Sequence, residues 1–181
     1  AMHNLELFNV DRLPIHHGQI RCWIAKKNVR KISNNLKKLI TRERQDKIYN
    51  NSTLINFGKK TLEIKYNLNK FFNKIKKKKE TIIGYGAPAK ATTLISFLGM
   101  NKNKVNFIVD KNPLKQNKFM PGSRIPIYSI DKIENFKPKY LFNFAWNFLN
   151  EILDQNKIFL KQGGKIINPI PKFKIYDYKK K

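Results

Sequence analysis

The stretch Thr81-Ile82-Ile83-Gly84-Tyr85-Gly86-Ala87-Pro88-Ala89-Lys90-Ala91 decides the fold class. A short apolar run, typical of a buried strand, leads into two glycines and then into a predicted helix. Gly84 permits a tight turn, Gly86 lets the backbone approach a ligand, and Pro88 suits a first helical turn. A strand, a glycine turn and a helix in this order are typical of the nucleotide-binding end of a Rossmann-like sheet.

Lys90 adds a second indication of a ligand at this turn. It falls in the first turn of the predicted helix, where the helix dipole disfavours an ammonium group. An anion bound at the same helix end would remove this penalty, so the position of Lys90 points to a phosphate ligand. The spacing Gly-x-Gly-x-x-Ala also occurs in strand-to-helix turns that bind nothing, and that purely structural alternative stays open.

Apolar runs alternate with helical stretches around and beyond this turn. They predict four strands and two helices, over 81–83, 105–109, 140–144, 165–167, 89–98 and 147–160. Such alternation predicts an α/β fold with right-handed crossovers, namely a Rossmann-like, mostly parallel sheet with helices on both faces, over residues 81–170. Asp110 follows the second strand, where an acidic residue either binds a ribose hydroxyl or only caps a turn.

A small strand and helix appendage is expected before this core. Alternating apolar positions over 5–30 predict two short strands around a turn, and a first helix is predicted over 34–47. A second helix, N-capped by Ser52, is predicted to reach 79 and to turn one apolar face to the core: Leu54, Phe57, Thr61, Ile64, Leu68, Phe71 and Ile75. We therefore expect an appendage over 1–50 and a Rossmann-like domain with a long leading helix over 51–181.

The chain is strongly basic. Its 181 residues include 38 Lys and Arg against 12 Asp and Glu, for a formal net charge of +26. Such an excess raises nucleic acid as a partner, because cations neutralise phosphates. The lysines are spread along the whole chain, so we interpret them as a solvated surface. A basic nucleic-acid-binding module remains the third hypothesis.

Localisation is predicted from what the sequence contains. The single Cys22 can form no internal disulfide, and no apolar run is long enough to cross a bilayer. The first residues, Ala1-Met2-His3-Asn4, have neither the basic nor the apolar region of a signal peptide. We interpret them as an expression remnant joined to an internal segment, and expect a cytoplasmic protein without a membrane partner whose natural chain begins upstream.

Several motifs occur in an order that resembles one known family. They are Gly84-Tyr85-Gly86-Ala87-Pro88-Ala89-Lys90-Ala91-Thr92-Thr93-Leu94, Val109-Asp110-Lys111-Asn112-Pro113-Leu114-Lys115-Gln116, Pro121-Gly122, Ile125-Pro126-Ile127, Ala145-Trp146-Asn147-Phe148, Gly163-Gly164-Lys165 and Asn168-Pro169-Ile170-Pro171. Together they resemble the C-terminal domain of S-adenosylmethionine-dependent sugar C-methyltransferases. The segment Leu13-Pro14-Ile15-His16-His17-Gly18 resembles that family's Leu-Pro-x-His-Gly-Gly, and the resemblance extends from about residue 5 to 176.

The resemblance implies a role in binding a nucleotide diphosphate-sugar, such as a dTDP-linked deoxysugar. It implies that His16 removes the proton alpha to a ketosugar carbonyl, although His17 takes this place if Gly18 anchors the alignment. At the sheet edge, Trp146 is interpreted first as a packing residue, and Asn147 could instead N-cap the following helix. The full set of candidate substrate-binding residues is Gly84, Tyr85, Gly86, Pro88, Lys90, Asp110, Lys115, Trp146 and Asn147.

The chain lacks what the family's other domains supply. In that family a zinc-binding domain and an S-adenosylmethionine domain precede this one. No second glycine-rich strand-turn-helix segment is present for S-adenosylmethionine, and one cysteine cannot form a multi-cysteine zinc site. We therefore expect a part of a longer methyltransferase, inactive by itself and binding neither cofactor. A free-standing NAD- or nucleotide-binding Rossmann protein is the alternative.

Overall fold

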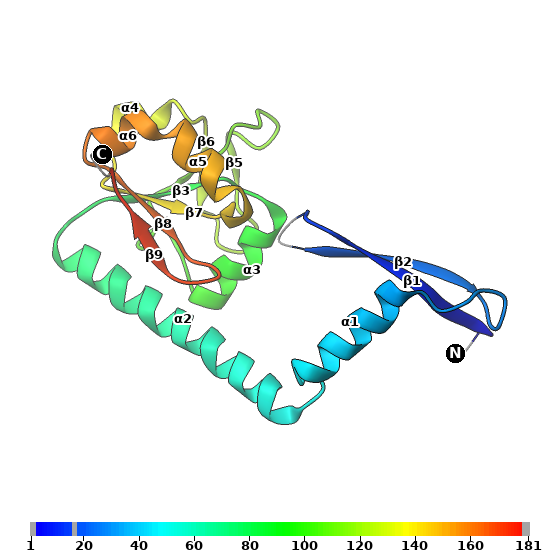
Figure 1. Cartoon of the computed structure of the whole chain (residues 1–181). Coiled ribbons are helices and arrows are strands. Elements are labelled where there is room, and N and C mark those ends of the chain that lie inside the picture. Colours follow the sequence, from blue (N-terminus) through cyan, green and yellow to red (C-terminus); the bar gives the residue numbers. More distant parts are fainter. Residues whose placement is uncertain (1–2, 16–17, 179–181) are drawn as a thin grey trace. The chain divides into compact units, whose positions relative to one another are not determined.

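The computed structural model describes residues 3–15 and 18–178, and the chain divides into two compact units, Ala1–Lys60 and Thr61–Lys181. Figure 1 shows the elements in chain order. They are β1 (Leu5–Leu13), β2 (Gln19–Lys26), α1 (Asn34–Gln45), α2 (Asn51–Lys77), β3 (Ile82–Tyr85), α3 (Ala89–Leu98), β4 (Ile108–Val109), β5 (Lys118–Phe119), β6 (Pro126–Tyr128), α4 (Lys132–Phe136), β7 (Tyr140–Asn143), the 3-10 helix η1 (Trp146–Phe148), α5 (Leu149–Gln155), α6 (Lys157–Lys161), β8 (Lys165–Asn168) and β9 (Lys174–Tyr176).

The first unit contains an antiparallel hairpin and a capped helix. β1 pairs with β2, as the alternating pattern predicts. Ser33 begins α1, because its hydroxyl accepts a hydrogen bond from the amide of Leu36 at 3.2 Å. Val10 and Leu36 are the buried apolar side chains among the described residues of this unit, so its core is small.

The second unit contains a sheet whose strand order is β5-β6-β4-β3-β7-β8-β9 among the described residues. β4, β3, β7, β8 and β6 run parallel, while β5 and β9 pair antiparallel at the two edges. The prediction of a mostly parallel, Rossmann-like α/β sheet is confirmed.

Helices cover both faces of this sheet. α3 and the C-terminal part of α2 pack on one face, in a cluster that includes Leu68, Phe72 and Leu94. α5 and α6 pack on the other face, through Ile152 and Leu160, with Ile133 of α4 packed against the same cluster. Side chains of β3 alternate between the two clusters, as a strand buried on both faces requires.

The predicted apolar face of α2 is correct only in its second half. Leu68 and Ile75 are buried, as expected, but Leu54 and Phe57 are 57% and 72% exposed. Phe72, which is outside the predicted face, is also buried. Both exposed residues precede Thr61, so they belong to the first unit. The sheet that covers the C-terminal part of α2 belongs to the second unit, which begins at Thr61. The predicted N-cap is also wrong, since α2 begins at Asn51 and contains Ser52.

No helix in the described part of the chain is long and apolar enough to span a membrane. Among residues 3–15 and 18–178, no group of three His, Cys, Asp or Glu side chains is placed to hold a metal ion.

Candidate functional site

The connections of the sheet diverge at the carboxyl end of β3. The chain leaves β3 toward β4 on one side, and it later returns to form β7 on the other side. Crossovers that diverge from one strand leave a ligand-binding crevice at the carboxyl ends of the strands. The turn after β3 and the loop after β7 meet at this edge, because the amide of Phe144 donates to the carbonyl of Tyr85 at 3.0 Å. We take this edge as the candidate site.

The two glycines of the Gly84-Tyr85-Gly86 motif have different roles. Gly84 lies inside β3 and not in the turn, so its predicted turn role is wrong. A Cβ at Gly84 would lie 2.6 Å from Ile108 Cγ1 and 2.6 Å from Phe144 Cε2, which explains why a strand residue has no side chain. Gly86 has a φ of +82°, which favours glycine, and a Cβ there would lie 3.1 Å from the Cβ of Ala145. Gly86 therefore makes the turn and Gly84 makes room in the core.

Asp110 joins the loop after β4 to the turn after β3. One carboxylate oxygen, Oδ2, accepts a hydrogen bond from the amide of Ala87 at 2.6 Å, and the other, Oδ1, accepts from the amide of Asn112 at 2.8 Å. The Asp110 side chain is only 12% exposed. Of the two sequence-based alternatives for this residue, the structure shows the turn-capping contacts, while binding of a ribose hydroxyl stays a prediction.

Lys115 strengthens the same junction. Its Nζ donates to the carbonyl of Ala87 at 3.0 Å and lies 3.6 Å from Oδ2 of Asp110. Gln116 Nε2 donates to the Asp110 carbonyl at 3.0 Å. The turn after β3 is thus held by side chains that are more than 20 residues away along the chain, a connection that local sequence patterns do not reveal.

Lys90 and Trp146 meet at this edge of the sheet. Lys90 lies in the first turn of α3, and its Nζ is 4.4 Å from the centroid of the Trp146 ring, within cation–π range. Burial lowers the pKa of Lys90. Trp146 also packs against the core cluster on the α3 side of the sheet, as the packing interpretation expects. A half-buried cation therefore lies against an aromatic face at the sheet edge.

Two buried amides that the sequence analysis did not select fix the loop after β7. Asn143 is fully buried; its Oδ1 accepts from the amide of Ala145 at 2.8 Å, and its Nδ2 donates to Asn168 Oδ1 at 3.0 Å. Asn168 Nδ2 in turn donates to the carbonyl of Ile170 at 2.6 Å. The signal that could have revealed them is an Asn at the end of each of two apolar strands, since a buried amide needs partners.

Asn147 does not cap the helix that follows. It lies within η1, and Phe148 occupies the N-cap position of α5, so the N-cap alternative for Asn147 is wrong. Its position in the loop directly after Trp146 keeps it at the candidate site.

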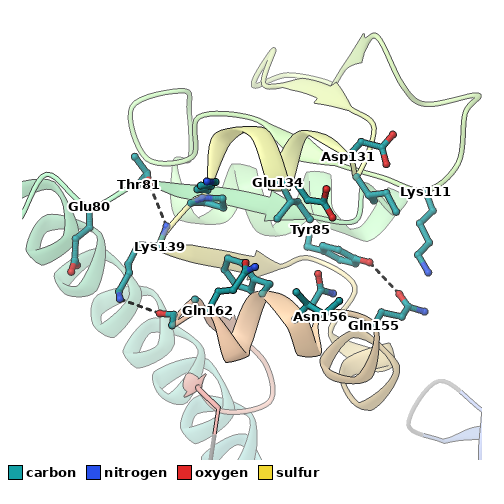
Figure 2. A pocket seen from close by; sticks show the side chains of 18 of the residues that line it. Glu80, Thr81, Tyr85, Lys111, Asp131, Glu134, Lys139, Gln155, Asn156 and Gln162 are labelled. Atoms are coloured by element: carbon teal, nitrogen blue, oxygen red, sulfur yellow. Dashed lines mark hydrogen bonds between the residues drawn. The ribbon is translucent and has the colours of Figure 1, made fainter.

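Tyr85 faces a groove on the other side of the sheet. Figure 2 shows its ring between α4 on one side and α5 and α6 on the other. The groove that Tyr85 lines there has a volume of about 1000 Å³. Its hydroxyl donates to Gln155 Oε1 at 3.1 Å, and burial raises the pKa of Tyr85. The groove extends as far as Thr81, at the opposite end of β3 from the turn. Tyr85 therefore reaches a different surface from Lys90 and Trp146.

The structure thus brings together most, but not all, of the predicted residues. Those that meet at the carboxyl edge are Gly86, Pro88, Lys90, Asp110, Lys115, Trp146 and Asn147. Gly84 lies in the core and Tyr85 in the groove. His16 and His17 lie outside the described residues, so the proposed base stays a prediction.

Comparisons with known proteins bear on the same residues. The family model of the C-methyltransferase C-terminal domain matches residues 14–171. The C-methyltransferase NovU of Streptomyces niveus is 44% identical over 92 residues, which are 51% of this chain and 22% of that protein. The matched segment therefore spans less than a quarter of the length of this relative.

Proposed function

The chain belongs to the C-methyltransferase C-terminal domain family, and from this membership we propose that it holds the nucleotide-linked sugar substrate of an S-adenosylmethionine-dependent sugar C-methyltransferase. The observation that carries the proposal is the pair of Lys90 and Trp146 at the carboxyl edge of the sheet, where α/β sheets with diverging crossovers bind ligands.

Lys90 is suited to the diphosphate of such a ligand. Burial lowers its pKa, so the protonated form is held at a cost in the ligand-free protein. A diphosphate beside the ammonium would offset that cost and would also oppose the unfavourable interaction with the N-terminus of α3. Lys115 contributes less, because its Nζ is 3.6 Å from the Asp110 carboxylate.

Trp146 and Asn147 are suited to the uncharged parts of the ligand. An indole face offers stacking area for a base or a sugar ring, and a carboxamide offers both a donor and an acceptor for hydroxyl groups. Both residues lie in the loop that the Asn143 and Asn168 amides fix, so they would be held in place before the ligand binds.

For the chemical step we propose His16 as the base, with His17 as the alternative. A neutral imidazole nitrogen would take the proton from the carbon alpha to the ketosugar carbonyl. The resulting carbanion would form a bond to the methyl carbon of S-adenosylmethionine while the bond from sulfur to that carbon breaks, and S-adenosylhomocysteine would leave. Imidazole has an ordinary pKa near 6.5, so a usable fraction is neutral at about pH 7.

The methyl donor and zinc belong, in this proposal, to other domains of the methyltransferase. The sequence has no second glycine-rich strand-turn-helix segment, and its one cysteine cannot form a multi-cysteine zinc site, so the proposal assigns neither cofactor to this chain. The chain alone is then expected to bind the substrate without transferring a methyl group, in the cytoplasm, with the donor-binding domain as its partner.

Calorimetric titration with dTDP and a dTDP-sugar at about 0.15 M salt tests the proposal, since exposed charges are largely screened there. Lys90→Met should weaken binding by about tenfold, the effect of losing one charge-assisted contact. Lys132→Met is the matched control, because Lys132 also lies at a helix start with its Nζ 4.7 Å from an aromatic ring, that of Tyr128. Equal losses in the two variants, or no binding by the unmodified chain, would refute a substrate site at Lys90.

A further inference from the structure

The turn after β3 has few backbone amides left for a phosphate. In dinucleotide-binding Rossmann proteins, the amides that follow the second glycine of this motif bind the pyrophosphate. The corresponding positions here are Ala87, Pro88 and Ala89. Proline has no N–H to donate, and the amide of Ala87 donates to Asp110 Oδ2 at 2.6 Å. Only Ala89 of the three keeps an amide that can face a ligand.

The carboxylate of Asp110 is firmly held where it blocks the turn. Its second oxygen accepts from Asn112 at 2.8 Å, Lys115 Nζ lies 3.6 Å away, and the side chain is 12% exposed. A phosphate that approached Ala87 would meet a negative charge at contact distance in a partly desolvated place, where repulsion between like charges is strong. It could displace the carboxylate only by breaking these contacts.

We infer that Asp110 is a specificity-determining residue that closes the glycine turn to dinucleotides. Its carboxylate occupies the position that a pyrophosphate oxygen would take at the Ala87 amide. An acidic residue after the second strand usually accepts a ribose hydroxyl of NAD, but here both oxygens bind the protein's own amides. The turn thereby keeps the shape of a dinucleotide site while phosphate is refused at the Ala87 amide, which leaves the diphosphate of the proposed substrate to Lys90.

Titration of the whole chain with inorganic pyrophosphate and with NAD, at constant ionic strength, tests this inference. The unmodified chain should not bind NAD measurably, and it should bind pyrophosphate only weakly, because the Ala87 amide is already occupied by Asp110. Asp110→Ala should gain about tenfold or more in affinity for pyrophosphate, because one amide becomes free to donate to an anion. Asp154→Ala is the matched control, since it removes the same charge from an exposed ion pair with Lys157.

The double variant Asp110→Ala, Lys115→Met separates the amide from the lysine that loses its partner. A gain that persists in the double variant supports the inference, and a gain that disappears assigns the effect to Lys115 and overturns it. NAD binding by the unmodified chain that is lost in Gly86→Val would overturn it as well.

A measurement on the unmodified chain keeps the inference testable if Asp110→Ala does not fold. The amide NMR signal of Ala87 should stay in place as pyrophosphate is added, whereas a saturable shift of that signal would overturn the inference. These readouts are separate from dTDP-sugar binding, so failure of the proposed substrate role and failure of the Asp110 inference give different results.

Discussion

Replacement of Gly84 by alanine should destabilise the second unit without changing the binding site. The new Cβ would lie 2.6 Å from carbon atoms of both Ile108 and Phe144, and both of these side chains are fully buried. Carbon atoms in contact normally keep about 3.5 to 4 Å, so each neighbour must move by about 1 Å within a packed core. Overpacking of this kind costs about 1–3 kcal/mol, and two rigid neighbours place Gly84→Ala in the upper part of that range.

Urea unfolding measures the effect of Gly84→Ala. With a slope of about 2 kcal/mol per M for a small domain, the midpoint should fall by about 1 M. Gly58→Ala is the control: Gly58 lies within α2 with open space around its Cβ position, and alanine is the better helix former. Below the transition, Gly84→Ala should bind a dTDP-sugar as the unmodified chain does. Unchanged stability together with lost binding would show that Gly84 contacts the ligand and would refute the packing explanation.

Two further predictions follow from burial and from charge. Leu68→Ala should lower the unfolding free energy by about 2–5 kcal/mol, because Leu68 is fully buried. Leu54→Ala, at a position that is 57% exposed, should change the unfolding free energy by less than about 0.5 kcal/mol. Equal urea midpoints for the two variants would contradict the assigned face of α2. The pKa of Lys90 is lowered in the folded protein, so between that pKa and 10.5 the unfolded chain binds more protons than the folded chain. The contribution of Lys90 to stability therefore rises with pH across this window, and it is lost as pH falls through the folded pKa. Comparison of urea midpoints between the unmodified chain and Lys90→Met across that window isolates this contribution from those of the tyrosines, and a difference that does not change with pH would contradict it.

The elements that the sequence predicts best are those with local signals at both ends. The helix predicted over 89–98 matches α3, because Pro88 precedes it and Gly99, with a φ of +57°, ends it. The helix predicted over 147–160 is divided instead into η1, α5 and α6. Asn156 is the residue between α5 and α6, and its Nδ2 donates a hydrogen bond to the Ile152 carbonyl. A periodic apolar pattern does not reveal this break.

Three strands were not predicted, and their sequences explain why. β5 and β6 have two and three residues, and β9 has three. Segments this short show no measurable alternation, and β6 begins with Pro126, which argues against a strand in a local analysis. β6 pairs with β4, β5 pairs with β6, and β9 pairs with β8, so the conformation of these strands depends on the tertiary fold.

The candidate site shows the same division between local and tertiary information. Gly86, Pro88 and Lys90 lie within one short stretch of the sequence, so a single motif predicts that they lie together. The hydrogen bond from Ala87 to Asp110 connects residues that are 23 positions apart, and it changes what the motif can bind. A glycine pattern therefore predicts the shape of the turn, but not which of its amides are available.

The excess of positive charge makes this local arrangement important for specificity. A formal charge of +26 attracts every polyanion, but that attraction is largely screened beyond about 8 Å at physiological salt. Selection among phosphorylated ligands must therefore come from short-range contacts that salt screens less, such as Lys90 against Trp146. Asp110 places a fixed negative charge at the Ala87 amide, where it repels other anions. Specificity here depends on where the chain rejects phosphate as well as on where it binds it.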